Sequence, residues 1–404
     1  MRDVDIAVAC FASCLGPSSS LSFFFASLFS VLFFATFAMA GPSSLSPTAA
    51  TLVYSPSVRS GVFVIVVGGC FSALAILCLS MMLLMSRTRL KFANTGTHLA
   101  LYFSCLLLSD TLQAAGAIMN LNWALNGEVV EGAFCTAQAA IKQAGNVSAA
   151  IMSFTIAVHV WNLLFMRYQT SMRAALGIVL FGWCFTTVVV LLGPTAVQTE
   201  AKGPFFGIDG EWCWIRKEYS REQVLLQYLF EAISVVCSLF LYFLTLLRVR
   251  GNLLKIDGRW TIRFLSKDDS WKLDLHRDYT DMAGIGLIKH MIWYPVAYMV
   301  LILPIAAVRI SAFAGASTPF GVTVFSDVLF VLCGLVDVVL FVTLNRVFPE
   351  LGNQPAFDTK RKTVDLSIME TGLTPFTLEK PVDPDARSIR STRSSINSTT
   401  PLRM

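Results

Sequence analysis

The chain has 404 residues, of which 55% are hydrophobic and only 14% are charged, and its formal net charge is +5. Soluble domains usually carry about a quarter charged residues, so this composition excludes an ordinary water-soluble core. The basic residues sit in short loops and in the tail, which argues against a nucleic-acid-binding surface and for membrane topology. The composition therefore predicts an all-α membrane protein.

The first apolar run lies at residues 21–40 and ends in the letters AMA. An A-x-A pattern behind an apolar run is typical of the cleavage site of a secretory signal peptide. We expect residues 1–40 to be a signal peptide and 41–60 a short extracellular segment. A retained signal anchor, or a leader outside the native reading frame, is the alternative.

Seven further apolar blocks follow, and each exceeds or matches the roughly 20 residues that a helix needs to cross a bilayer core. Basic residues are frequent in the odd-numbered loops between these blocks and scarce in the second and sixth. The positive-inside rule then places the odd loops and the C-terminus in the cytoplasm, with the start of the first block outside. The predicted spans, within a domain of residues 61–346, are Gly61–Met85, Thr97–Leu121, Cys135–Phe165, Ala174–Gly193, Val224–Leu247, Leu287–Val308 and Val322–Leu344.

The C-terminal segment, residues 347–404, is polar, rich in Ser and Thr, and interrupted by prolines. Such a composition predicts a disordered cytoplasmic tail. Its stretch RSIRSTRSSINSTT (387–400) places hydroxyl groups beside arginines, so kinases acting there would reverse the local charge. A solvated tail without any such switch is the alternative.

Two of the ten cysteines fall in predicted outer loops of the mature chain. Cys135 opens the third block, and Cys213 lies in the second outer loop. Both would face an oxidising compartment, so we predict a disulfide that holds this loop over the mouth of the bundle. Two exposed free thiols are the alternative.

Polar side chains within the apolar blocks are costly in lipid and usually face the interior of a bundle. Gln138, Lys142 and Asn146 are spaced by four residues, so they share one face of the third block. Glu231 and Asp327 lie at a similar depth, roughly 7–10 Å below the outer ends of their blocks at 1.5 Å per residue. The pattern predicts an outer polar cavity in which Lys142 meets an anionic or polar group of a ligand. A Lys–carboxylate pair that only neutralises itself is the alternative.

Two further features of the blocks bear on a signalling role. Asp110 and Asp337 lie deeper, and we expect a water-linked or ion-linked network between the second and seventh spans, or simple hydrogen bonding. In the sixth span Pro295, two residues after Trp293, removes a backbone hydrogen bond and predicts a kink. That kink would serve either as a hinge or as a static bend.

No catalytic motif is visible. The sequence has no G-x-S-x-G, no H-E-x-x-H and no phosphate-binding loop, and its four histidines are scattered. We therefore expect no enzymatic activity, no cofactor and no metal site.

Five phrases carry a family resemblance: LSDTLQAAGAIMNLNWALNG (108–127), CTAQAAIKQAGNVSAAIMSFTIAVHVW (135–161), EWCWI (211–215), YPVAYMVLILPIAAVRI (294–310) and FSDVLFVLCGLVDVVLFVTLNR (325–346). Together they resemble the fungal G-protein-coupled receptors related to the slime-mould cyclic-AMP receptors and the fungal glucose-sensing receptors. The resemblance covers roughly residues 60–346.

The resemblance implies a seven-transmembrane receptor in the plasma membrane, with an extracellular N-terminus and a Cys135–Cys213 bridge. It also implies an extracellular small-molecule ligand, either a nutrient or a nucleotide-like compound, and a heterotrimeric G protein (Gα) upstream of cyclic-AMP signalling. The chain departs from the family pattern at Asn146, Ser148 and Asp337. It also lacks the D-R-Y and N-P-x-x-Y motifs, so the activation switches of rhodopsin-like receptors do not transfer.

On this reading, basic residues at the cytoplasmic rim would face the G protein, and contact with anionic membrane lipids is their simpler role. They are Arg87, Arg89, Arg167, Arg248 and Arg250. A seven-span transporter or channel is the alternative function, although paired broken helices are not evident. A retinal-binding light sensor or pump would need a lysine in the last span, and residues 322–344 contain none.

Overall fold

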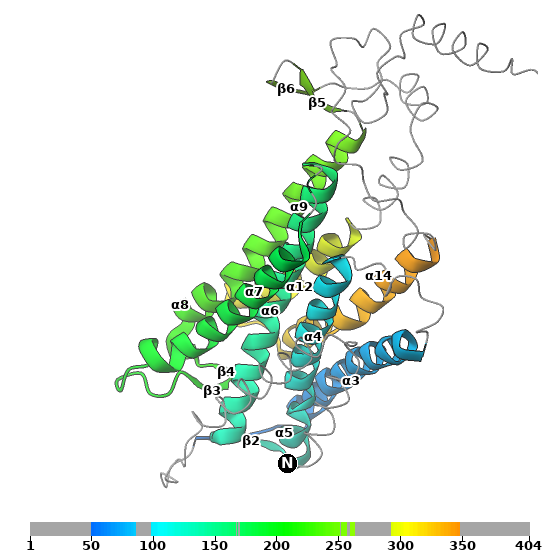
Figure 1. Cartoon of the computed structure of the whole chain (residues 1–404). Coiled ribbons are helices and arrows are strands. Elements are labelled where there is room, and N and C mark those ends of the chain that lie inside the picture. The colour runs from blue at the N-terminus through cyan, green and yellow to red at the C-terminus, as the bar shows by residue number, and fades with distance from the viewer. Residues whose placement is uncertain are drawn as a thin grey trace, which may run out of the picture.

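A computed structural model describes residues 50–85, 98–166, 168, 170–250, 252–256, 259–262 and 292–347. These residues form a bundle of long helices with short β-hairpins at its two ends (Figure 1). The predicted signal peptide and all but the first residue of the predicted tail lie outside the described residues.

The helices of the bundle are α3 (Pro56–Met85), α4 (His98–Ile118), α5 (Asn120–Asn126), α6 (Ala133–Leu164), α7 (Met172–Leu192), α8 (Ser220–Gln223), α9 (Leu229–Arg250), α12 (Trp293–Phe313), α13 (Phe320–Val331) and α14 (Cys333–Val347). Single π-helical turns at Gly193–Val197 and Val224–Tyr228 extend the fourth and fifth spans. Over the described residues, seven helical stretches are long and apolar enough to cross a membrane. The prediction of seven spans is confirmed.

The outward faces of the helices are apolar. On α3 the exposed side chains include Phe71, Leu74 and Leu77, which recur at helical spacing. Similar large apolar side chains are exposed on α7, α9 and α12. An apolar belt of this extent is unfavourable in water and matches the hydrocarbon core of a bilayer. The described bundle is that of a multi-pass membrane protein.

Helix α6 lies at the centre of the bundle, in contact with α4, α7 and α9. Its buried face is rich in small side chains, which allow neighbouring backbones to approach closely in a membrane. At Gly145, an added Cβ would lie 2.7 Å from the backbone nitrogen of Gln113 on α4, so only glycine fits there. This close approach places the polar face of α6 against α4.

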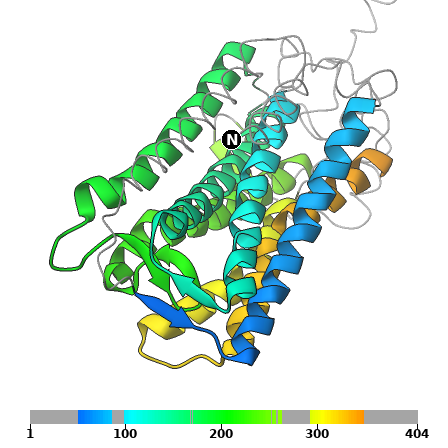
Figure 2. The same cartoon turned by 90° about the horizontal axis from the view of Figure 1, so that it is seen from below.

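Two antiparallel strand pairs gather at one end of the bundle, as Figure 2 shows from below. Strand β1 (Thr51–Val53) pairs with β2 (Glu128–Val130), and β3 (Phe206–Asp209) pairs with β4 (Trp212–Ile215). The two-residue turn between β3 and β4 begins at Gly210, whose φ of 66° is a left-handed value that favours glycine. The hydroxyl of Tyr54 donates a hydrogen bond to the backbone oxygen of Glu211, which joins the two strand pairs.

The predicted disulfide is confirmed. Cys135, in the first turn of α6, is bonded to Cys213 in β4, with a Cα–Cα distance of 5.2 Å and a sequence separation of 78. We call this end of the bundle the disulfide end. The hairpin of β5 (Leu253–Ile256) and β6 (Arg259–Ile262) lies at the opposite end (Figure 1).

The sixth and seventh spans differ from the expected single blocks. Helix α12 begins at Trp293, so Pro295 lies in its first turn, where backbone N–H groups have no intrahelical partner. The proline inside the described helix is Pro304, and the residues before Ile292 lie outside the described part of the chain, so the kink at Pro295 stays a prediction. A hinge role for Trp293 and Pro295 stays a prediction. The seventh span is broken at Leu332, between α13 and α14.

Removing the disulfide should destabilise the disulfide end. Chain-entropy arguments give about 4 kcal/mol for a bridge that closes a loop of this length. We expect the C135S/C213S double variant to melt roughly 10 °C lower than the wild type, measured by intrinsic tryptophan fluorescence in detergent. The exposed free cysteine Cys184 provides the control, since C184S should leave the melting temperature unchanged. Equal melting temperatures for the double variant and the wild type would contradict a stabilising role.

Candidate functional site

A cavity of about 30 Å³ lies at the disulfide end between α4, α6, α12, α13 and the β3–β4 hairpin. About 10–15 Å³ of such space suffices for one water, so the cavity in this state has room for roughly two. Most of its lining side chains are polar or aromatic. They are Gln113, Lys142, Asn146, Trp212, Trp214, Gln227, Tyr228, Ile305, Arg309, Asp327, Phe330 and Val331.

Lys142 enters the cavity from α6. Its Nζ lies 4.8 Å from the centroid of the Trp212 ring, within the range of a cation–π interaction. Its aliphatic stem passes close to Gly116, where an added Cβ would lie 2.5 Å from Lys142 Cγ. Among the residues that the structure describes, no carboxylate oxygen lies within 4.0 Å of Nζ. The lysine is held in place by packing rather than by an ion pair.

Arg309 enters from the last turns of α12 and ties this helix to the hairpin. Its Nη1 donates a 2.8 Å hydrogen bond to Oδ2 of Asp209 in β3, and both side chains are largely buried. The guanidinium carbon also lies 4.7 Å from the centroid of the Trp214 ring. Charge-assisted hydrogen bonds of this kind are the strong ones in proteins. We call the Arg309–Asp209 pair the latch.

Several buried polar atoms of the cavity wall have no hydrogen-bond partner within the described part of the chain. Among them are both amide atoms of Gln113 and Oδ2 of Asp327, in side chains that are at least 94% buried. Buried polar groups in proteins are almost always paired, because an unpaired one costs roughly 1–3 kcal/mol. These atoms give the cavity a donor and two acceptors that the fold does not use.

The structure brings together three of the five side chains predicted for the cavity, namely Lys142, Asn146 and Asp327. Sequence reasoning missed Arg309, Gln113 and the two tryptophans. Trp212 and Trp214 flank Cys213 in the sequence, so a predicted Cys135–Cys213 bridge could have placed them beside α6. Arg309 lies near the end of the sixth span, and no local signal in the sequence pairs it with Asp209.

Gln138 does not line this cavity. Its amide nitrogen donates to Oδ1 of Asn120 at 2.6 Å and to the backbone oxygen of Gly116 at 3.1 Å. Its amide oxygen accepts from Nε1 of Trp123 at 2.7 Å and from the backbone nitrogen of Cys213 at 3.4 Å. The side chain is fully buried and holds α4, α5, α6 and the hairpin together.

Glu231 is linked to the cavity wall through Gln227. Its Oε1 accepts a hydrogen bond from Gln227 Nε2 at 3.2 Å, and Gln227 Oε1 accepts from Trp214 Nε1 at 2.9 Å. The glutamate therefore orients a wall residue of the fifth span and does not itself line the cavity.

The deeper carboxylates lie near the break in the seventh span. An added Cβ on Gly334 would lie 3.0 Å from Asp110 Cβ and 2.5 Å from the hydroxyl of Ser72, so α14 packs tightly on α3 and α4. Asp337 follows one turn later on α14. The predicted network between Asp110 and Asp337 remains a prediction.

At the opposite end, Arg248 is enclosed by aromatic rings. Its guanidinium carbon lies 4.7 Å from the Phe165 centroid and 4.9 Å from that of Trp260 in β6. It does not stand on an open rim in this state, because the β5–β6 hairpin covers it. The other predicted rim residues fall outside the description: Arg87, Arg89 and Arg167 entirely, and Arg250 in its side chain.

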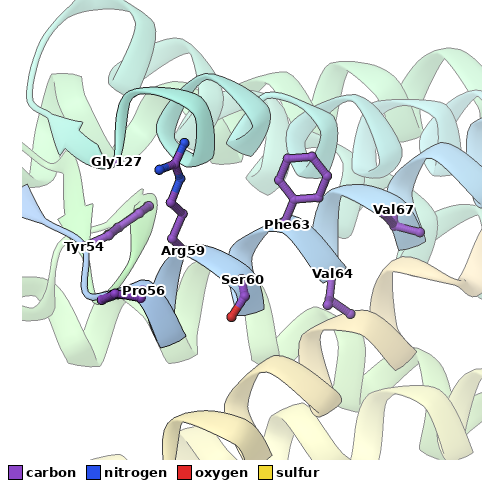
Figure 3. Close-up of a pocket in the computed structure, with 8 residues that line it drawn as sticks. All are labelled: Tyr54, Pro56, Arg59, Ser60, Phe63, Val64, Val67 and Gly127. Carbon is purple, nitrogen blue, oxygen red and sulfur yellow. The ribbon is translucent and has the colours of Figure 1, made fainter.

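A larger hollow of about 630 Å³ runs along the outer face of α3 (Figure 3). Its wall is mostly apolar, with Phe63, Val64 and Val67 exposed. The guanidinium of Arg59 is bound to the backbone oxygens of Ala124 and Leu125, at 2.7 and 3.1 Å. The apolar side chains of this face will lie against bilayer lipid, so the cavity lined by Lys142, Asp327 and Arg309 is the better candidate for a ligand site.

Comparison with known proteins identifies the fold. No protein-family model matches this sequence, and no curated protein sequence matches it either. The crystal structure of squid rhodopsin matches with a TM-score of 0.54 and 14% sequence identity, over 74% of this chain and 87% of that one. The chain has a G-protein-coupled-receptor fold. At this low identity the likeness concerns the fold alone, and the resemblance to the fungal cyclic-AMP-receptor-like family rests on the sequence.

The effects of mutating Arg309 and Asp209 on stability should be strongly non-additive. Removing one partner leaves a buried charge unpaired, which typically costs 3–5 kcal/mol. We expect R309Q and D209N each to lower the melting temperature clearly, and the double variant to lose less than the sum of the two. A double-mutant cycle on the more exposed pair Arg216–Glu218 is the control, with an expected coupling below about 1 kcal/mol. Additive effects at the latch would show that its two ends act independently.

Proposed function

We propose that this protein is a G-protein-coupled receptor that binds an extracellular small molecule in the cavity at the disulfide end. The observation that carries the proposal is a receptor fold with a cavity lined by charged and aromatic side chains, whose wall contains unpartnered buried groups. A disulfide at that end and basic loops at the other support an extracellular position for the cavity. The protein would reside in the plasma membrane, upstream of cyclic-AMP signalling.

The latch suggests how ligand binding at the disulfide end would change the conformation of the opposite end of the bundle. Arg309 belongs to α12 and also lines the cavity, so a ligand that contacts it changes the balance between helix and hairpin. A receptor responds by shifting its population toward the state that the ligand binds better. In that state the cytoplasmic ends of α9 and α12 would separate, and the β5–β6 hairpin would uncover Arg248 for the Gα subunit.

The same proposal includes the other predicted partners, which are anionic lipids and kinases. The arginines of the cytoplasmic rim would contact the G protein or anionic lipids, and the Ser- and Thr-rich tail would be the substrate of kinases. Only Arg248 of these groups has a described side chain, and its aromatic enclosure is what the proposed opening would release.

A transporter or channel is the second candidate, because the seventh span is broken at Leu332. Transporters built from repeats place such breaks in corresponding halves. Flux of a solute into proteoliposomes without any G protein would favour this alternative.

The receptor function can be tested with the purified full-length chain in nanodiscs. We expect at least one compound from a panel of sugars, amino acids and nucleotides to accelerate nucleotide exchange on a heterotrimeric G protein. K142M should reduce that response at least tenfold, because Lys142 lines the cavity. K217M, at an exposed lysine of the same end, is the control and should respond like the wild type. A panel without any effect on several Gα classes would refute the proposal.

A further inference from the structure

The charges around the cavity divide into a paired set and an unpaired set. Arg309 and Asp209 neutralise each other in the latch, at 2.8 Å. Lys142 and Asp327 also line the cavity, from α6 and α13, yet their charged groups are more than 4.0 Å apart. The formal charges of the four groups sum to zero. One cation and one anion therefore remain in a buried space without direct contact.

Unused hydrogen-bonding atoms lie in the same wall. Oδ2 of Asp327 has no partner, and the amide of Gln113 leaves both its donor and its acceptor free among the described residues. The Trp212 ring stabilises the ammonium of Lys142 through its face and leaves its N–H donors available. The wall thus offers donors near Lys142 and acceptors near Asp327, with an amide that can serve either side.

We propose that the cavity binds a compact zwitterion, whose anionic group meets Lys142 and whose cationic group meets Asp327. The smallest amino acids are the class that fits this description. The inference rests on the proposed function for the role of the cavity, and it adds the chemical class of the ligand.

Charge balance favours this class over the simpler ones. A purely anionic ligand would satisfy Lys142 and leave Asp327 facing a second negative charge, and a purely cationic ligand would do the reverse. A neutral ligand would displace water from both charges without compensating either. A zwitterion keeps the total at zero and gives each buried charge a partner. With room for roughly two waters in this state, the cavity must widen to admit even the smallest amino acid, so a ligand of few atoms requires the least rearrangement.

The test uses the full-length chain in nanodiscs and measures the shift of its melting temperature with added ligand. The probes are glycine, L-alanine and L-serine, the separate halves acetate and methylammonium, and neutral acetamide. We expect a saturable upward shift with at least one amino acid. The halves, alone or mixed, and acetamide should give no comparable shift at the same concentration.

Two single variants separate recognition from a structural role. D327N retains Lys142, so it should lose at least tenfold in affinity for the amino acid and gain binding of acetate. K142M retains Asp327, so it should lose the amino acid to the same extent and gain binding of methylammonium. A purely structural Lys142–Asp327 pair would not produce this exchange of preferences. K217M should bind as the wild type does.

The outcomes distinguish this inference from the proposed function. The zwitterion proposal would be overturned if acetate or methylammonium raised the melting temperature of the wild type as much as every amino acid does. This comparison needs only the wild type, so it stands even if both variants fail to fold. Absence of amino-acid binding, with nucleotide exchange driven by another compound, would also overturn it while the receptor function stood. Amino-acid binding without any response from a G protein would support the zwitterion and refute the receptor.

Discussion

The Cys135–Cys213 bond holds the β3–β4 hairpin against the first turn of α6 at the disulfide end of the bundle. Because Trp212 and Trp214 flank Cys213, the same bond places two aromatic rings over the polar face of α6 and against α12. Gln138 sits beneath the bond and accepts a hydrogen bond from the backbone of Cys213. Without this attachment the cavity would lack one of its walls.

The cost of burying polar groups organises what lies inside that wall. Charged side chains in a membrane protein are tolerated where they face the interior and find partners. Arg309 and Asp209 pair directly, and one oxygen of Glu231 accepts a hydrogen bond from Gln227. Lys142 has only an aromatic face, and Asp327 keeps one oxygen unpaired in the described structure. The unpaired charges of Lys142 and Asp327 in the cavity wall support the proposed ligand site.

The two ends of the bundle show the same combination of an arginine and aromatic rings. Arg309 packs on Trp214 at the disulfide end, and Arg248 packs between Phe165 and Trp260 at the opposite end. In both places the arginine of a helix holds a β-hairpin. A signalling equilibrium requires contacts that form in one state and break in another, and these two arginine contacts, on spans six and five, are candidates for that role.

The sequence by itself determined the seven spans and the disulfide, and it placed Lys142, Asn146 and Asp327 in one polar region. The spans and the polar positions are local properties, because apolar length, loop charge and helical spacing can be read within one segment. The disulfide followed from topology, because Cys135 and Cys213 are the two cysteines that the predicted outer loops of the mature chain contain. The latch, the packing role of Gln138 and the enclosure of Arg248 were decided by the tertiary structure. Each depends on which residues from distant segments meet, and a hydrogen bond or ion pair across 100 positions, as between Asp209 and Arg309, leaves no periodic trace in the sequence.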